Sequence, residues 1–192
     1  MSEAEAIVEF WLHEVGLDGW YVADDAIDTE IRTRFLTSWE AAERGEREFW
    51  LSGPGGSLAY LILTDQFPRN MFRGDARSFA TDARARAAAR LATDKGWDLA
   101  VPEPERVFYY MPFEHSEDLA DQDHCIALLE RNLVSTRDEF VLHARAHREI
   151  INRFGRFPFR NAALGRASTD AEVEFMANGG YGRIVEALKT GG

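Results

Sequence analysis

Apolar residues recur at the 3.6-residue spacing of an α-helix along most of this chain, and this pattern constrains the fold most. Ile27, Ile31, Phe35 and Trp39 follow one another at four-residue steps, for example. No segment of useful length alternates apolar and polar residues as a half-buried strand does. Residues 107–110 would suit a strand, but they lie between helical segments and precede a proline. We therefore predict an all-α fold of antiparallel helices joined by short loops.

Capping residues and helix breakers set the expected boundaries. Asp75, Ser116 and Thr169 are suited to cap helices, and Pro68 is expected to end the helix before it because proline restricts the preceding residue. The glycines at 179 and 180 are expected to follow the last helix. The helices that we predict cover residues 4–15, 25–44, 57–66, 76–94, 103–111, 117–133, 137–154 and 170–176, with a short piece at 48–51.

The length and composition favour one domain with a full core. The chain has 192 residues, of which 45% are hydrophobic, so we predict a single all-helical domain over residues 1–192. No apolar run approaches the roughly 20 residues that span a bilayer. The first residues are acidic, unlike the start of a signal peptide. One cysteine, Cys125, allows no internal disulfide, and we expect it to be buried in a helix. These features predict a cytoplasmic protein.

The charge of the chain restricts its partners. The formal net charge is −11. This disfavours duplex DNA and anionic membranes as partners, because both bind proteins through basic side chains that neutralise their phosphate groups. Lysine occurs only as Lys95 and Lys189, so nearly all basic residues are arginines. Arginine is suited to forked pairing with carboxylate or phosphate groups. We expect neither a nucleic acid nor a membrane as partner; the oligomeric state is left open.

Three stretches carry a resemblance to a known family. They are residues 63–73 (LTDQFPRNMFR), 110–117 (YMPFEHSE) and 153–161 (RFGRFPFRN). In this order and spacing they resemble the bacterial family called domain of unknown function 924, over about residues 6–188. The resemblance implies a tetratricopeptide-like superhelix of stacked helix pairs and no settled activity. Phe159 stands where the family usually has histidine, so the resemblance supports no proton-transfer or metal-binding role at this position.

Asp65 and the arginines that follow it form the first candidate site. Asp65 lies at the carboxyl end of an apolar helix, where the helix dipole disfavours a carboxylate. We therefore expect it to have a partner, with Arg69 and Arg73 within two turns. One interpretation is a structural ion pair that ties a loop to the helix end. The other is a functional carboxylate.

A second candidate is a local cluster of arginines among phenylalanines, Arg153, Arg156, Arg160 and Arg166. The protein's own acids, an anionic ligand or an acidic peptide would each explain it. The Phe-Pro-Arg-Asn sequence that ends at Asn70 has an echo in Phe-Pro-Phe-Arg-Asn at 157–161. Two proline-stiffened turns of this kind would present forked donors and amides to one anion.

The histidines supply the third candidate. His115 lies in a loop where Glu114 or Glu117 would hold the imidazole for general acid–base work. Alternatively, the acids complement a helix that Ser116 caps. His143 and His147 share one helix face, but His147 lies on an apolar stripe and is expected in the core. No HExxH motif accompanies them, and we predict neither a metal nor a cofactor.

These observations predict a pocket for a small anionic ligand or carboxylate, with possible hydrolytic or acid–base activity; whether the protein is an enzyme is left open. The catalytic candidates are His115, Asp65 and Glu117. The alternative is a tetratricopeptide-like interaction module that binds an acidic peptide without catalysis. In a third interpretation the same residues only join helix ends. The ligand-binding candidates are Arg69, Asn70, Arg73, Arg153, Arg156, Arg160 and Asn161.

Overall fold

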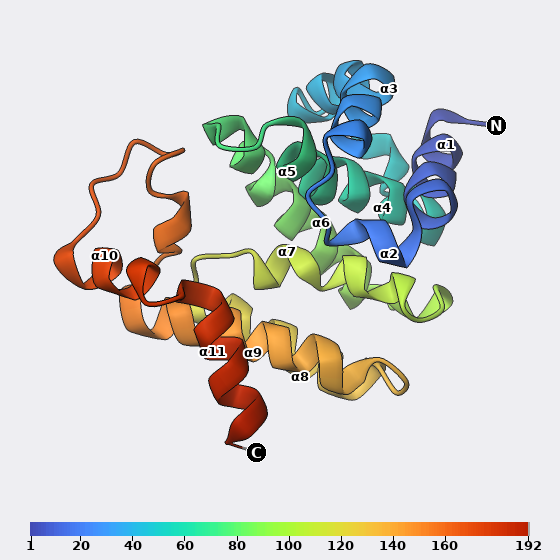
Figure 1. The fold of residues 1–192 in the computed structure, drawn as a ribbon. Helices are drawn as coiled ribbons and strands as arrows, with labels where there is room; N and C mark the ends of the chain where they lie inside the picture. Colours follow the sequence, from blue (N-terminus) through green and yellow to red (C-terminus); the bar gives the residue numbers. More distant parts are fainter. Residues whose placement is uncertain (192) are drawn as a thin grey trace. The chain divides into compact units, whose positions relative to one another are not determined.

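The computed structural model describes residues 1–191, which divide into two compact units. The first unit is Met1–Pro112, and the second begins at Phe113. Helices and turns make up both units, and residues 1–191 contain no strand (Figure 1). The all-α prediction is confirmed. One domain over residues 1–192 stays a prediction.

The first unit is a series of α-helices interrupted by short π and 3-10 segments. Its α-helices pack around a shared apolar core, and the chain then enters α7 (Met111–Glu114), within which the unit boundary falls. The elements are α1 (Glu3–Glu9), a π segment (Phe10–Val15), α2 (Gly16–Trp20), α3 (Asp25–Glu43), a 3-10 turn (Glu48–Trp50), α4 (Pro54–Leu61), a π segment (Ile62–Gln66), α5 (Phe67–Met71), a 3-10 turn (Ala76–Phe79), α6 (Asp82–Asp94), and 3-10 turns at Asp98–Ala100 and Glu105–Tyr109.

Aromatic side chains fill the core of the first unit. The Phe67 ring packs against Phe35, with centroids 5.0 Å apart, and edge-on against Trp11 at 5.5 Å. Phe35 belongs to the predicted apolar face of α3, and Ile31 and Trp39 from the same face are also buried. The helical spacing therefore identified the buried face correctly.

Several boundaries in the first unit differ from the prediction. Pro68 does not end the helical stretch, which runs without a break from α4 through the π segment into α5, and it lies near the start of α5. Asp75 caps only a 3-10 turn, and α6 begins at Asp82. The break arises because Thr81 donates its hydroxyl to the Thr64 carbonyl at 2.6 Å, and Ser78 donates to the Phe72 carbonyl. These side-chain bonds hold residues 76–81 in a conformation that does not continue as an α-helix.

The second unit is built on two long helices that lie side by side, α8 (Leu119–Asn132) and α9 (Arg137–Phe154) (Figure 1). A 3-10 turn (Pro158–Arg160), α10 (Asp170–Ala177) and α11 (Gly180–Thr190) follow. Cys125 of α8 is fully buried, as predicted. The cap of α8 is Asp118, which accepts from the Ala120 N–H at 2.8 Å, and not the predicted Ser116.

Helix α11 was not predicted, because two glycines precede its apolar residues. Gly179 is its N-cap with φ of 96°, a conformation that favours glycine. Ile184 and Val185 of α11 pack into a core cluster with Ile150 and Ile151 of α9. Packing against α9 therefore holds α11 in place where local sequence signals are weak. No helix within residues 1–191 is both long enough and apolar enough to span a bilayer.

Candidate functional site

Asp65 lies in the π segment that follows α4, with a side chain that is 1% exposed. Arg69 Nη1 lies 3.3 Å from Asp65 Oδ1 and 3.0 Å from Asp82 Oδ1. Its Nη2 donates to Asp82 Oδ2 at 3.1 Å. One guanidinium thus bridges two carboxylates inside the first unit. The structural Asp–Arg pair suggested by the sequence is present, and an external anion at Arg69 would compete with both acids.

Asn70 and Arg73 share a different carboxylate, Asp28 at the start of α3. Asn70 Nδ2 donates to Asp28 Oδ1 at 2.8 Å, and Arg73 binds both Asp28 oxygens. Asp28 is buried. The pairing ties the end of α5 to α3, so the first Phe-Pro-Arg-Asn stretch joins helix ends within its unit.

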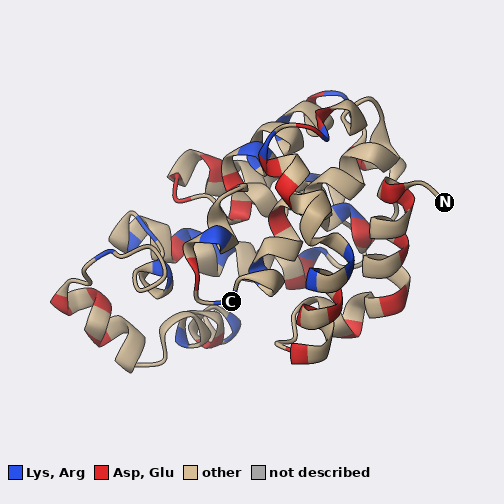
Figure 2. Cartoon of the chain, turned by 90° about the horizontal axis from the view of Figure 1, so that it is seen from above, with Lys and Arg blue, Asp and Glu red and all other residues tan. Residues whose placement is uncertain are grey.

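The second Phe-Pro stretch is anchored by glutamates of the second unit. Arg156 makes two bonds to Glu172, at 2.6 and 2.8 Å, and Asn161 Nδ2 lies 3.3 Å from the same carboxylate. The Arg156 side chain is the main cause that lowers the pKa of Glu172 to about 2, and the Thr169 N–H adds to the effect. Basic and acidic positions adjoin one another along the ribbon in Figure 2.

Glu117 serves the same anchoring role. It accepts from Arg166 at 2.7 and 2.9 Å and from the Phe157 N–H at 2.8 Å. Burial would raise the pKa of Glu117, but the Arg166 and Phe157 hydrogen bonds outweigh it and lower the pKa. Arg160, which is 6% exposed, donates to the His115 carbonyl at 3.0 Å, and its guanidinium lies 4.5 Å from the Phe157 ring centre.

Five side chains of the second unit form what we call the histidine centre: Glu114, His115, His143, His147 and Tyr181. Glu114 Oε1 lies 2.8 Å from His147 Nδ1, and the Glu114 residue is 5% exposed. His143 Nδ1 hydrogen-bonds the Tyr181 hydroxyl. The His147 ring centre is 4.9 Å from that of Tyr181 and 6.4 Å from that of His115. The centre therefore gathers three imidazoles, a phenol and a buried carboxylate.

The contacts of His147 fix its tautomer. Its Nδ1 faces two acceptors, the Glu114 carboxylate and, at 3.0 Å, the His143 carbonyl oxygen. A nitrogen between two acceptors must carry a proton. In the neutral ring Nε2 is then the basic nitrogen, which is the arrangement that orients an imidazole for proton transfer.

The charges of the centre are coupled. Burial alone would raise the pKa of the Glu114 carboxyl, but His147, and more weakly His115 and His143, outweigh it and hold the pKa below its ordinary value. Burial lowers the pKa of His143. Within residues 1–191 no group of three or more His, Cys, Asp or Glu side chains is arranged to hold a metal ion.

The sequence pointed to part of this centre. It suggested Glu114 or Glu117 as partner of a loop imidazole, and Glu114 does bind an imidazole, that of His147 in α9. His147 is not a simple core residue, since its side chain is 18% exposed. The four-residue spacing of His143 and His147 was the available signal. The contribution of Tyr181 was missed together with α11.

The predicted site residues fall into both units. Asp65, Arg69, Asn70 and Arg73 lie in the first unit, where they form the two pairings described above. The other predicted residues lie in the second unit, and of these only His115 belongs to the histidine centre; they are His115, Glu117, Arg153, Arg156, Arg160 and Asn161.

The fold and these contacts define an all-helical protein whose second unit contains a hydrogen-bonded histidine centre. The model of the family described as bacterial protein of unknown function (DUF924) matches residues 7–180. The chain belongs to this family. The solved structure of a protein of unknown function from Agrobacterium tumefaciens is similar, with 43% identity and a TM-score of 0.84, over 90% of this chain and 96% of that one. No functionally curated protein matches the chain.

Proposed function

We propose that the histidine centre binds a small anion, such as a carboxylate or phosphate, and exchanges a proton with it through His147. The observation that carries the proposal is the Glu114–His147 contact at 2.8 Å. A buried carboxylate on Nδ1 stabilises the imidazolium that forms when Nε2 takes up a proton. The charged ring then lies between Glu114 and a bound anion, so that anion binding and proton uptake favour each other.

The surroundings of the centre support an anionic ligand. Arg160 is buried beside His115, and its positive charge also lowers the pKa of Glu117. A buried cation raises the local potential and attracts anions. Proton transfer occurs at His147 and not at the predicted His115, whose ring centre lies 6.4 Å from that of His147. Glu117 and Asp65 act by holding Arg166 and Arg69 in place.

A thermal-unfolding screen of the full-length protein tests this function. Phosphate, succinate and citrate are titrated at about pH 6 and about pH 8, on either side of the usual histidine pKa. A ligand at about 100 times its dissociation constant adds about 2.7 kcal/mol of stability. We expect a dose-dependent rise in the unfolding temperature with at least one anion, larger at the lower pH because binding requires the imidazolium.

Two variants make the screen specific to the histidine centre. His147→Gln keeps a donor for Glu114 but has no titrating nitrogen, and it should lose the anion effect while remaining folded. Arg44→Ala removes an exposed arginine of the first unit, and this variant should still be stabilised by the anion. If no anion stabilises the wild type at either pH, or if His147→Gln responds equally, the proposal is wrong.

A second candidate function is an interaction module for an acidic peptide. The helix pairs that pack in sequence, α8 with α9 and α9 with α11, suit the stacked arrangement of a tetratricopeptide-like superhelix. The specific observation in its favour is a surface groove of the second unit that four arginines border. This function needs no proton transfer, so it is separable from the first.

A further inference from the structure

A groove of about 750 Å³ runs along α9, α10 and α11 of the second unit. Four arginines line it, namely Arg145, Arg148 and Arg153 of α9 and Arg183 of α11, against two glutamates, Glu149 and Glu174. We call it the arginine groove. This excess of positive charge is local, because the whole chain has a net charge of −11.

The floor of the arginine groove is apolar. Phe154 and Phe175 line it with ring centres 5.0 Å apart, and Ile184 and Leu188 continue it along α11. Both phenylalanines are partly buried and pack against the core cluster of the second unit. A ligand in the groove would thus meet an apolar surface bordered by cations, which favours a molecule that carries carboxylates and bulky apolar groups together.

The arginines are available to such a ligand. The side chain of Arg183 is exposed, and within residues 1–191 it has no ion-pair or hydrogen-bond partner. Arg145 pairs with Glu130 at 2.9 Å, but the two side chains are 57% and 47% exposed. Arg148 pairs with Asp123, with side chains that are 35% and 55% exposed, and Arg153 pairs with Glu149, at 50% and 33%. Exposed pairs contribute only about 0–1 kcal/mol, so carboxylates of a ligand can replace the partner at little cost.

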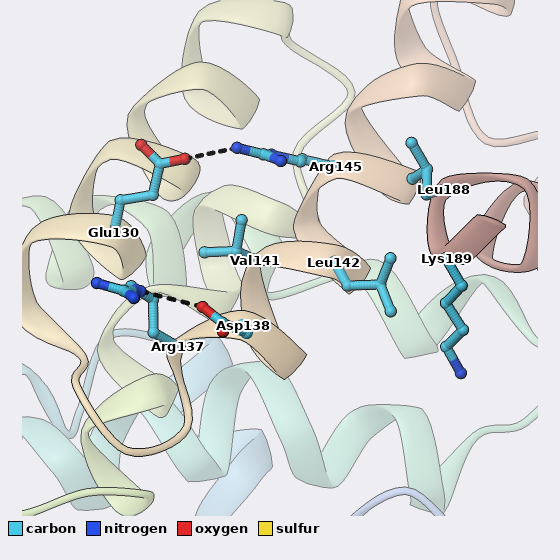
Figure 3. Close-up of a pocket in the computed structure, with 8 residues that line it drawn as sticks. All are labelled: Glu130, Arg137, Asp138, Val141, Leu142, Arg145, Leu188 and Lys189. Atoms are coloured by element: carbon cyan, nitrogen blue, oxygen red, sulfur yellow. Dashed lines mark hydrogen bonds and ion pairs between the residues drawn. The ribbon is translucent and has the colours of Figure 1, made fainter. Parts of the chain in front are cut away.

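The charges extend along the helix. Arg145 and Arg153 are eight residues apart on α9, which corresponds to roughly 12 Å along a helix axis. A smaller pocket of about 500 Å³ shares Arg145 and Leu188 with the groove and adds the cations Arg137 and Lys189 together with the acids Glu130 and Asp138 (Figure 3). In Figure 3 Arg145 reaches from α9 toward Glu130 of α8, beside Leu188 of α11. A row of cations of this length matches several carboxylates on one extended ligand better than one small anion.

We infer that the arginine groove binds an acidic segment of a partner protein, one in which glutamates or aspartates alternate with bulky apolar side chains. The inference gives the second candidate function its residues and does not depend on proton transfer at the histidine centre. A nucleic acid fits less well, because glutamates line the groove and the protein as a whole is acidic.

Fluorescence anisotropy of the full-length protein with a labelled synthetic peptide of alternating Glu, Leu and Phe tests the inference. A peptide with Gln for Glu and an oligonucleotide serve as comparison probes. The Glu peptide should bind, more weakly as salt rises, and the Gln peptide should bind at least about tenfold more weakly. The double variant Arg148→Glu/Arg183→Glu should weaken binding of the Glu peptide by at least about tenfold.

The matched control is Arg44→Glu/Arg77→Glu, which makes the same charge change at exposed arginines of the first unit. It should bind within about twofold of the wild type, because neither arginine lines the arginine groove. The inference would be overturned if both double variants lost peptide binding equally, if the Gln peptide bound as tightly as the Glu peptide, or if the oligonucleotide bound more tightly than the Glu peptide. The Glu peptide should bind equally at about pH 6 and about pH 8, because glutamate and arginine keep their charges over this range, and this separates the result from that for the histidine centre.

Discussion

Replacing Arg69 by alanine should lower the free energy of unfolding by about 3–5 kcal/mol, the usual cost of removing one partner of a buried ion pair. Arg69 bridges Asp65 and Asp82, whose side chains are 1% and 15% exposed. Without the guanidinium both carboxylates remain desolvated and close to each other. Urea denaturation at neutral pH measures the change.

Arg44→Ala is the matched control for Arg69→Ala. Arg44 also pairs with a carboxylate, Glu46 at 2.8 Å, but both side chains are more than half exposed. Its loss should cost about 0–1 kcal/mol. If Arg69→Ala does not fold, Arg69→Lys provides the measurement, because lysine keeps the positive charge but lacks the several N–H donors of the planar guanidinium. A cost for Arg69→Ala no larger than that for Arg44→Ala would show that the bridge is not structural.

His147→Ala should have an effect of similar size, about 3–5 kcal/mol at neutral pH, because it leaves the buried Glu114 carboxylate without its partner. In the wild type the pKa of Glu114 is lowered, so its contribution to stability is present above the ordinary glutamate pKa and is lost as pH falls through the lowered value. In the variant the His147 imidazole no longer opposes the effect of burial, so the pKa of Glu114 should rise. The difference in the free energy of unfolding between the wild type and the variant should therefore shrink as the pH falls and Glu114 is protonated.

A double variant separates the charge from the packing. His147→Ala/Glu114→Gln has no buried carboxylate, so it should be more stable than the sum of the two single changes implies. The readout is the free energy of unfolding of the four proteins across the acidic and neutral range. Additive effects, or a His147→Ala deficit that does not depend on pH, would contradict a coupled pair.

Periodic apolar spacing predicted the parts of the fold that bury one continuous face. The four-residue steps of α3 and the stripe of α9 are examples, and Phe35 and Ile151 are buried as expected. Prediction failed where tertiary bonds decide the backbone. Thr81 binds a carbonyl 17 residues earlier and delays α6, and α11 depends on packing against α9. Local propensities contain neither of these interactions.

The candidate site was predictable in its residue types more than in its pairings. No helix ends at Asp65, because the π segment continues into α5, but the arginine partner that the expected helix end indicated is present: Arg69 lies four residues later, about one turn along. Glu114 and His147 are separated by a loop and the whole of α8. Only the packing of α9 brings the imidazole to the carboxylate. Spacing in the sequence therefore could not identify their contact.

The most direct test of the histidine centre is ¹⁵N NMR of the histidine ring nitrogens, with and without the anion that stabilises the protein best. The contacts of His147 predict a proton on Nδ1 and a basic Nε2 in the neutral ring. Addition of the anion should place a proton on Nε2 as well, an effect absent in Glu114→Gln. A neutral ring with its proton on Nε2, or a His147 spectrum that no anion changes, would contradict the account.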